Sequence, residues 1–489
     1  MPARDLHYGV VMKNRCIIFL LVVVTAVHAH GQEPDLPTQA KTGLRKACGF
    51  FRDKINTEGG YLWRYSADLA RREGESKATA TQAWVQPPGT PSVGQAWLEA
   101  YHATRDRYYL EGAVLTAHAL ARGQLESGGW DYLIEFDPAK RKTYAYLADK
   151  NAAGKKNVST LDDDTTQAAL RFLMNVDIAL ERKDAKVRAS VEYSLEQLLK
   201  TQYPNGAWPQ RFSAPPEAAK FPIKKASFPE KWPREYPAKD YRGHYTFNDN
   251  SITTMIDTML QAARQYDEPR YRQAALKAGD FMILAQLPEP QPGWAQQYDA
   301  DMQPAWARKF EPPAVTGGES QGVMRSLLKL YAESGDKKYL EPLPRALAYY
   351  RKSLLPDGRL ARFYEMKTNR PLYFTKKYEL TYKDDDVPTH YGFKVGHKLD
   401  AIAKEYDRLA KLSPDELKKK RPPELPKVTE ALVAQVKAIL KALDDQGRWV
   451  DDGKLRYHGP DDKTDRIIEC ATFIRNVGIL SRYLEATRK

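Results

Sequence analysis

The stretch Thr160-Leu161-Asp162-Asp163-Asp164-Thr165-Thr166 places three consecutive carboxylates directly before an apolar run that continues to residue 179. The spacing of that run predicts a helix that begins at these residues. One aspartate is enough to cap a helix, because its side-chain oxygen accepts a hydrogen bond from a free backbone N–H. Three adjacent carboxylates repel one another, which is tolerable only in water or around a cation. The stretch therefore predicts either a solvated helix cap or a site for a hard cation such as Ca²⁺.

A loop signature of glycine next to an aromatic or arginine residue recurs along the chain. It occurs at 59–63, 128–130, 205–208, 292–294, 357–359 and 446–449. Recurrence at intervals of tens of residues indicates a repeat architecture. Between the loops, apolar periodicity predicts pairs of helices at 91–104 and 108–125, 162–180 and 185–202, 249–266 and 269–286, 318–334 and 338–354, and 393–410 and 428–444.

One further helix is expected at each end of the chain, at 37–56 and 465–487, and these two would form a sixth pair. Helix pairs with glycine-aromatic loops on one rim are typical of an α/α toroid. The expected fold class is therefore all-α, a partial or closed ring of helix pairs with Gly/Trp-rich rim loops. Cys48 and Cys470 fall on the two terminal helices. They would form either a disulfide that clasps the ring or two buried, small apolar side chains.

The composition describes a globular, basic chain. Its 489 residues are 42% hydrophobic, which is enough for a large core in one domain or in two or three smaller ones. The formal net charge of +13 favours an anionic partner, such as nucleic acid, anionic lipid or an acidic polysaccharide. The sequence has no zinc-finger spacing, dinucleotide-binding fingerprint or P-loop.

The N-terminus has the pattern of a secretory signal. Lys13 and Arg15 precede an apolar run over 17–27, and Ala29 ends a small-residue cleavage site. That run is short for a membrane span, and no other stretch of the sequence is long and apolar enough. We therefore expect a signal peptide over 1–29, one toroidal domain over 30–489, and a secreted or periplasmic protein without a membrane anchor.

Two stretches are expected to lie outside the ring. Residues 213–240 are rich in proline and lysine, which predicts an extended insertion over one face. Residues 413–426 contain the basic run Lys418-Lys419-Lys420-Arg421, which predicts a solvated linker between two helices. This run lacks the interleaved aromatic residues of a nucleic-acid site, so no nucleic-acid partner is expected.

A second polar stretch has the same form as the first. His244-Tyr245-Thr246-Phe247-Asn248-Asp249-Asn250 also comes just before an apolar helical run. In a toroid, the loops that open successive inner helices face one funnel, so the two helix starts are expected to meet there. Carboxylate and amide oxygens at this density suit Ca²⁺ better than Zn²⁺, although the alternative is again helix capping. The predicted metal ligands are Asp162, Asp164, Asp249 and Asn250.

Arginines beside aromatic residues recur on the later rim loops, at Arg308, Arg362 and Arg370. Arginine binds carboxylates through two parallel hydrogen bonds, and aromatic rings stack on sugar faces. The pattern favours an acidic polysaccharide as the partner. The alternative is a set of surface ion pairs, with Glu311 and Glu365 as partners.

At these motifs the sequence resembles the family-ten pectate lyases. The resemblance rests on five motifs in order over residues 160–375, with a weaker one at 472–477. They are LDDDTT at 161–166, YPNGAWPQ at 203–210, HYTFNDN at 244–250, WARKFE at 306–311, and RFYE with TNRP at 362–365 and 368–371. Members of that family are described as helical partial toroids that cleave polygalacturonate by β-elimination with Ca²⁺, which leaves 4,5-unsaturated oligogalacturonates.

The resemblance implies roles for the residues of these motifs. Asp162 and Asp249 would be the acidic residues of the calcium and substrate site, and Arg308 would be the base. Arg362 and Arg370 would bind substrate carboxylates. Further substrate contacts are expected from Asp163, Asn248, His244 and Trp208. The chain is expected to act as a monomer.

The expected chemistry explains this choice of residues. The C5–H of galacturonate lies next to a carboxylate and is too weak an acid to ionise unaided. Pairing that carboxylate with Ca²⁺ and arginine would stabilise an enolate-like transition state. Arginine is an unusual base because its pKa lies above about 12, so Arg308 would need a site crowded with cations.

Three other functions remain open from the residues alone. An inverting glycoside hydrolase would use two carboxylates about 6.5–9.5 Å apart, with Asp164 and Asp249 as the pair. A terpene cyclase also carries an aspartate-rich motif on a toroid, but Leu161 stands where its leading aspartate is expected, and an arginine-rich rim suits an anion better than a hydrocarbon. A non-catalytic protein that binds acidic glycans would need only the basic groove.

Overall fold

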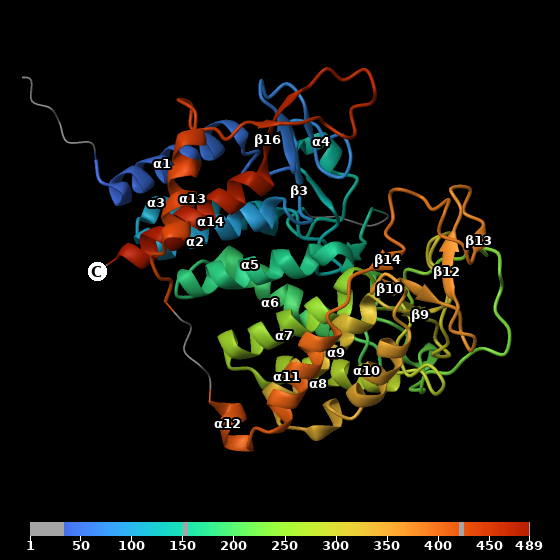
Figure 1. Ribbon diagram of the computed structural model, residues 1–489. Coiled ribbons are helices and arrows are strands. Elements are labelled where there is room, and N and C mark those ends of the chain that lie inside the picture. The colour runs from blue at the N-terminus through green and yellow to red at the C-terminus, as the bar shows by residue number, and fades with distance from the viewer. Residues whose placement is uncertain (1–33, 150–154, 420–424, 489) are drawn as a thin grey trace, which may run out of the picture.

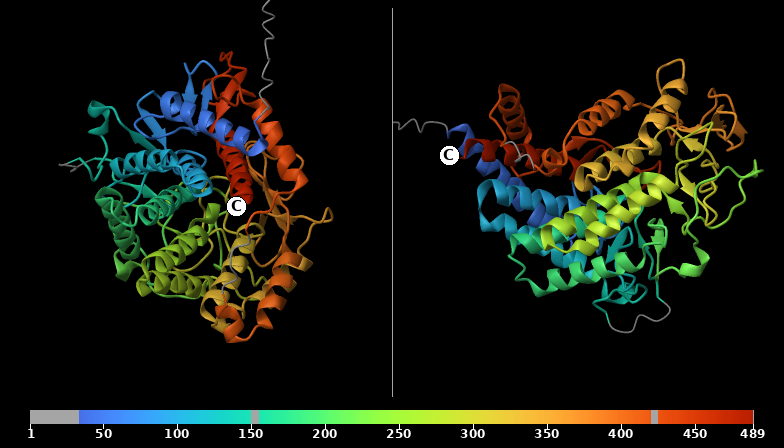
Figure 2. Two further views of the ribbon diagram at one scale, coloured as in Figure 1. Left: turned by 90° about the vertical axis from the view of Figure 1, so that its left-hand side faces the viewer. Right: turned by 90° about the horizontal axis from the view of Figure 1, so that it is seen from below.

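The computed structural model describes residues 34–149, 155–419 and 425–488. The expected signal peptide over 1–29 lies outside the described residues. Helices dominate the described chain, and two perpendicular views show them arranged in a ring (Figures 1 and 2). The fold is an all-α toroid, as the sequence predicts.

The inner row of the ring consists of helices that pack side by side in the order α14, α2, α5, α7, α9, with α11 next to α9. Their bounds are α2 (Thr90–Thr104), α5 (Thr165–Ala179), α7 (Ser251–Tyr266), α9 (Glu319–Ser334), α11 (Leu399–Ala410) and α14 (Cys470–Thr487).

The outer row packs against the inner one. Its helices are α1 (Leu36–Phe50), α3 (Arg107–Arg122), α6 (Ala185–Lys200), α8 (Pro269–Leu284), α10 (Leu343–Lys352) and α13 (Glu430–Ala442). Asp35, Asp106 and Asp184 cap the first three of these helices, each accepting a hydrogen bond from a backbone N–H of the first turn. Two short helices lie outside the rows, α4 (Pro138–Arg141) and α12 (Pro414–Lys418).

Several predicted helices begin later than expected. The expected helix at 465–487 starts only at Cys470, because strand β16 (Arg466–Glu469) precedes it and pairs with β1 (Arg64–Ser66). The expected helix at 393–410 starts at Leu399, after strand β14 (Lys394–Val395). In both places apolar residues of a short strand extend the apolar pattern of the helix that follows.

Five of the six glycine loops form one recurring turn, and the loop at 292–294 differs from it. In each, a backbone N–H donates to a carbonyl at or just after the glycine, as in Leu125 to Gly129 and Tyr203 to Ala207. The glycines at 59, 128, 206, 358 and 447 have φ between +77° and +107°, a region that side chains with a Cβ rarely adopt. The repeat seen in the sequence is therefore a repeat of backbone conformation.

These turns also connect neighbouring pairs of the ring. A Cβ on Gly59, Gly128 or Gly206 would lie 2.1–2.4 Å from an atom of the next outer helix, on α3, α6 and α8 in turn. Gly447 meets Lys46 of α1 in the same way, which joins the last outer helix to the first. Gly358 has no atom within 4 Å of that position. The repeat is thus broken after α10.

The tryptophans of the signature belong to the core. Trp130, Trp208 and Trp294 are completely buried, and each indole N–H donates to a carbonyl near the end of the preceding outer helix at 2.8 Å. Trp449 makes the equivalent bond to Ile439 at 3.0 Å. These side chains fix each turn to its own outer helix.

Short antiparallel ladders precede the inner helices and position the rim. Strand β5 (Ser159–Thr160) pairs with β6 (Arg211–Phe212) before α5, and β7 (Tyr245–Thr246) pairs with β8 (Gln297–Tyr298) before α7. The ladder of β3 (Gln82–Trp84) with β4 (Leu133–Glu135) lies ahead of α2 in the same way. Each ladder joins the entry of one inner helix to the turn that follows its outer helix.

A small β-rich lobe extends the rim beyond the ring (Figure 1). Its four-stranded sheet has the order β13-β12-β11-β9. The strands are β9 (Val315–Thr316), β11 (Phe363–Tyr364), β12 (Pro371–Phe374) and β13 (Leu380–Thr381), and β10 (Leu360–Ala361) pairs with β14. The lobe has its own apolar cluster around Phe363 and Phe374. The remaining strands are β2 (Arg72–Glu73), which pairs with β1, and β15 (Asp451–Asp452), which pairs with β16.

The 213–240 insertion runs from the ring to this lobe. Most of it is extended, apart from one short 3₁₀ turn at Ala218–Lys220. Trp232 packs against the apolar cluster of the lobe, and Trp306 donates a hydrogen bond to the Pro233 carbonyl at 2.9 Å. The insertion therefore forms part of the wall of the rim.

Cys48 and Cys470 are both buried free thiols, so the structure has the apolar alternative rather than the disulfide. In the described parts of the chain, no helix combines the length and apolar character needed to cross a bilayer.

Substituting Gly206 tests the packing of the turns. In Gly206→Ala the new Cβ would lie 2.1 Å from the Lys277 carbonyl oxygen, which is backbone and cannot move alone. Gly358→Ala is the matched control, because it introduces the same positive-φ strain of about 1–2 kcal/mol without a clash. We expect Gly206→Ala to lower the free energy of unfolding by roughly 2 kcal/mol more than the control, measured by urea denaturation. Equal losses would contradict this account of the ring.

Candidate active site

Two acidic turns with the same backbone conformation open helices α5 and α7. Residues Asp162–Asp164 and Asn248–Asn250 each form a 3₁₀ turn whose second and third residues are left-handed, with φ between 45° and 61°. Aspartate and asparagine tolerate this conformation better than most residues. Backbone strain of this kind clusters at functional sites, because the surrounding structure must hold it in place.

Matching hydrogen bonds hold the two turns. Thr160 Oγ1 accepts from the Asp162 N–H, and Thr246 Oγ1 accepts from the Asn248 N–H, both at 3.1 Å. The Gln167 side chain donates to the carbonyls of Leu161 at 2.8 Å and Ser251 at 3.2 Å. Gln167 thereby joins the two helix starts, as the sequence argument expected them to meet.

The acidic side chains do not cap these helices. Helices α5 and α7 have no side-chain hydrogen bond at their N-caps, in contrast to the aspartate caps of the outer helices. The capping alternative therefore does not explain the acidic residues.

Three carboxylates meet where the turns come together. One oxygen each from Asp162, Asp163 and Asp249 lies within 4.8 Å of the others. One oxygen of each carboxylate accepts a hydrogen bond. Asp162 accepts from Tyr132 at 2.9 Å, Asp163 from Gln86 at 2.9 Å, and Asp249 from Asn248 at 2.7 Å. Asp162 Oδ1 is buried and accepts no hydrogen bond from the described residues. The cluster therefore presents oxygen atoms that the protein does not satisfy, as a metal site requires.

Burial and negative charge within the cluster raise the pKa of two of its carboxyl groups, Asp163 and Asp249. Burial and the charges of Asp162 and Asp249 raise the pKa of Asp163 to about 7. Desolvation and the charge of Asp162 raise the pKa of Asp249 to about 6, against the lowering effect of Arg308. Unfavourable crowding of like charges is what a bound cation would relieve.

Asp164 and Asn250 do not join this cluster, although both were predicted as ligands. Arg171, about two helical turns further along α5, binds both oxygens of Asp164 at 2.9 and 2.5 Å. Asn250 takes the corresponding place in the second turn, where its side-chain oxygen lies against Gly322 of α9. The third residue of each turn thus has its own contact on a neighbouring helix residue and lies outside the cluster.

The other predicted substrate contacts, from Asn248, His244 and Trp208, differ in their surroundings. Asn248 is buried and donates a hydrogen bond to Asp249 Oδ2. The Oδ1 atom of Asn248 accepts one from Gln296 at 3.0 Å. His244 is half-buried, and the nearby charges are those of Asp299 and Asp240 rather than the acidic cluster. The predicted contact from Trp208 is wrong, because this side chain is completely buried and binds the Leu198 carbonyl.

A second charged network faces the cluster from the β-rich lobe. Arg308 binds Glu311 through Nε at 2.8 Å and Nη2 at 2.6 Å, and Arg362 binds Glu319 at 3.0 Å. The Tyr391 hydroxyl connects the two pairs, since it donates to Glu311 at 3.0 Å and accepts from Arg362 at 3.2 Å. The charges of Arg308 and Arg362 both act on Asp249, so both arginines face the acidic cluster.

The Glu311 pair determines the charge of Arg308. Burial alone would lower the pKa of the guanidinium, but the hydrogen bonds and negative charge of Glu311 raise it. Arg308 is therefore a firmly protonated cation in this arrangement. Burial alone would lower the pKa of the neighbouring Arg362, but Glu319, Tyr391 and Asp249 together raise it.

Arg370 is exposed and contacts the lobe rather than the acidic cluster. Its guanidinium stacks on the Tyr382 ring at 3.4 Å, and the Tyr382 hydroxyl donates to Glu365 at 2.8 Å. Arg234, from the 213–240 insertion, also pairs with Glu365. Glu365 is thus an ion-pair partner, as predicted. Its partner is Arg234 of the insertion rather than one of the neighbouring rim arginines.

Sequence reasoning missed the side chains that hold the acidic cluster. Tyr132 and Gln86 come from segments before the acidic motif, and Trp84 fixes Gln86 through a hydrogen bond at 2.9 Å. Tyr391 comes from a loop after the last motif. None of these residues belongs to a repeated pattern, and only the folded ring brings them to the rim.

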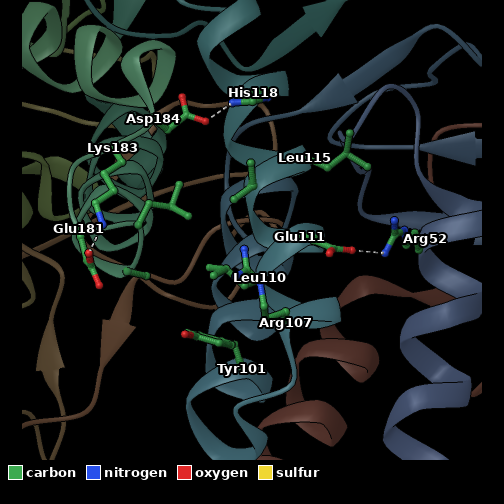
Figure 3. Close-up of a pocket in the computed structure, with 13 residues that line it drawn as sticks. Arg52, Tyr101, Arg107, Leu110, Glu111, Leu115, His118, Glu181, Lys183 and Asp184 are labelled. Carbon is green, nitrogen blue, oxygen red and sulfur yellow. Dashed lines mark hydrogen bonds and ion pairs between the residues drawn. The ribbon is translucent and has the colours of Figure 1, made fainter.

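A separate cavity of about 860 Å³ lies at the opposite end of α5, against α3 (Figure 3). Apart from Arg107, its charged side chains form pairs, Arg52 with Glu111, His118 with Asp184, and Lys183 with Glu181. The carboxylates of these pairs are already occupied, so this cavity lacks the unsatisfied acidic cluster found at the rim.

Comparison with known proteins identifies the class of the site. The family model described as pectic acid lyase matches residues 124–360, a range that contains both acidic turns and the Arg308 loop. The fold and the matched site define a polysaccharide lyase. Within that class, residues 124–360 match the pectic acid lyase family, which confirms the resemblance found in the sequence. No curated protein sequence matches the chain.

Several solved structures are similar to the chain. A family 10 polysaccharide lyase from Cellvibrio cellulosa has 22% identity and a TM-score of 0.44, over 66% of this chain and 98% of that one. A mutant of that lyase in complex with trigalacturonic acid has 21% identity and a TM-score of 0.43, over 65% and 98%. A GH76 α-mannanase from Bacteroides thetaiotaomicron has 11% identity and a TM-score of 0.40, over 92% and 96%.

Glu311→Gln tests the network that faces the cluster. Glu311 is almost fully buried and accepts four hydrogen bonds, from the backbone N–H, Nε and Nη2 of Arg308 and from Tyr391. A neutral amide cannot accept all four, so we expect the free energy of unfolding at pH 7 to fall by about 1–3 kcal/mol. Glu217→Gln, which breaks an exposed pair with Lys220, should change it by less than about 0.5 kcal/mol.

The pH dependence of the same variant provides a second check. The arginine contacts lower the pKa of Glu311 despite its burial, so its stabilisation is present above the pKa of the unfolded state. As pH falls through the folded pKa, the difference between wild type and Glu311→Gln should shrink. A difference that grows on acidification would contradict the assigned charge. Urea denaturation at a series of pH values measures it.

Proposed function

We propose that this lyase cleaves polygalacturonate by β-elimination and that Asp162, Asp163 and Asp249 hold the Ca²⁺ ion the reaction needs. The convergence of these three carboxylates at two matching helix starts carries the proposal. The products would be 4,5-unsaturated oligogalacturonates.

The donor atoms at the cluster fit calcium. Ca²⁺ prefers carboxylate and carbonyl oxygens, and all the atoms offered here are oxygens. The buried Asp162 Oδ1 has no hydrogen-bond partner among the described residues, and a cation would satisfy it. Tyr132, Gln86 and Asn248 each hold one oxygen of an aspartate, which orients the three carboxylates in advance.

The arginines of the lobe complement an acidic polymer. Arg362 is held as a cation by buried Glu319, so it keeps its charge when a substrate arrives. A uronate carboxylate between Arg362 and the cluster would be paired on both sides. When bound, Ca²⁺ would supply positive charge that neutralises this carboxylate and acidifies the adjacent C5–H.

The elimination requires one base. The C5 proton passes to the base, its electron pair forms the C4–C5 double bond, and the C4–O bond breaks with protonation of the leaving oxygen by water. Arg308 is the proposed base, because it lies near Asp249 of the cluster and in the motif whose resemblance implies that role. Its pairing with Glu311 raises the pKa and opposes this role, so the proposal requires Arg308 to lose a proton within a strongly cationic environment.

An ultraviolet assay on polygalacturonate tests the function. We expect absorbance from the conjugated double bond to rise with calcium and to stop when a chelator is added. Chain shortening without that absorbance would support the glycoside hydrolase instead. Calcium-dependent binding without shortening would support the non-catalytic glycan binder. Either of these results would contradict the proposal.

Asparagine variants test the assigned ligands. Asp162→Asn and Asp249→Asn should each weaken calcium binding by at least about tenfold and reduce the initial rate, since each removes a charged ligand. Asp164→Asn is the matched control, because its carboxylate is bound to Arg171 rather than to the cluster. Calorimetric titration with CaCl₂ should give wild-type affinity for the control. Equal loss in all three variants would contradict the assignment.

A further inference from the structure

Arg211 differs from the other arginines around the acidic cluster. Arg308, Arg362 and Arg171 are each paired with a carboxylate, at 2.6, 3.0 and 2.5 Å. Across residues 34–149, 155–419 and 425–488, Arg211 has no such ion pair. Its charge therefore remains available beside the site.

The ladder before α5 fixes the place of Arg211. Arg211 on β6 lies opposite Thr160, two residues before Asp162. Its Nη2 donates to the Tyr132 hydroxyl at 3.3 Å, and that hydroxyl donates to Asp162 Oδ2 at 2.9 Å. The guanidinium also stacks on the Tyr132 ring at 5.3 Å. Tyr132 thus separates Arg211 from the acidic cluster and prevents a direct ion pair with it.

Arg211 has hydrogen-bond donors that the described protein does not use. A guanidinium carries five N–H groups, and the bond to Tyr132 uses one of them. Nε is buried without a partner among the described residues. Asp131 lies nearby, but its carboxylate accepts from the Tyr132 N–H at 2.8 Å, and burial raises its pKa. An unsatisfied cation of this kind is costly unless a ligand pairs with it.

Arg211 and Arg308 both lie near Tyr241. Tyr241 is half-buried, and the charges of Arg308, Arg211 and Asp162 all act on its hydroxyl. A polymer that lies across the cluster towards Arg308 would therefore also pass Arg211 and the Tyr132 ring.

We propose that Arg211 binds the carboxylate of a uronate unit next to the unit that is cleaved, with the Tyr132 ring beside the sugar. This inference rests on the proposed function and deepens it, because it assigns the recognition of one neighbouring unesterified unit to a single residue. A methyl ester has no negative charge and accepts weaker hydrogen bonds, so it gains little from a guanidinium.

Binding without turnover tests the assignment. Isothermal titration calorimetry in the presence of a chelator compares trigalacturonate with its methyl ester. We expect Arg211→Gln to weaken trigalacturonate binding by about tenfold to a hundredfold and to leave the ester unchanged. Arg211→Lys should fall between the two, because lysine keeps the charge but loses the planar fork. With calcium, KM for polygalacturonate should rise by a similar factor.

Arg242→Gln is the matched control. The Arg242 carbonyl accepts from the Arg211 N–H, but its exposed side chain binds Asp240 at 2.9 and 2.8 Å. Its affinity and KM should equal those of wild type. A folded Arg211→Gln protein with wild-type affinity and KM would overturn the inference, and should that variant not fold, wild-type values in Arg211→Lys would do so.

The two proposals fail in different ways. Wild type that binds trigalacturonate through Arg211 but releases no unsaturated product would refute the elimination and support the assigned subsite. Wild type that cleaves polygalacturonate with no contribution from Arg211 would refute the subsite alone. Wild type that binds no uronate oligomer, with or without calcium, would refute both.

Discussion

Repulsion among Asp162, Asp163 and Asp249 is the constraint on which the rest of the rim depends. Three carboxylates within 4.8 Å of one another would separate unless the backbone held them. Two left-handed turns, two threonine hydroxyls and the Gln167 bridge supply that rigidity. The ring in turn holds the turns, because the loops at Gly59, Gly128, Gly206 and Gly447 pack on the next outer helix.

The charges around the cluster form a layered arrangement. Carboxylates occupy the centre, guanidinium groups flank them, and buried glutamates lie behind Arg308 and Arg362. This arrangement suits a substrate whose carboxylate pairs with a guanidinium group and with a cation bound by the cluster. It also opposes the proposed role of Arg308 as a base, because the glutamate that positions Arg308 also raises its pKa.

The sequence was sufficient for the ring and for the meeting of the two acidic turns. Positive-φ glycines and buried tryptophans are repeated, so their spacing is visible without the structure. The same repetition misled the prediction for Trp208, which belongs to the core because, like Trp130 and Trp294, it binds a helix carbonyl.

Side-chain direction within the turns was not predictable. Adjacent aspartates look equivalent in the sequence, yet Asp163 lies in the cluster and Asp164 pairs with Arg171. Tyr132, Arg211 and Tyr391 are single residues on separate segments, and only the short ladders and the lobe bring them to the site.

A crystal structure of the protein soaked with calcium and a uronate oligomer would test the central claim most directly. The account predicts an anomalous peak with oxygens of Asp162, Asp163 and Asp249 at about 2.3–2.6 Å, and a substrate carboxylate facing Arg308. A calcium ion bound elsewhere, with the three carboxylates left without a cation beside the bound oligomer, would contradict it.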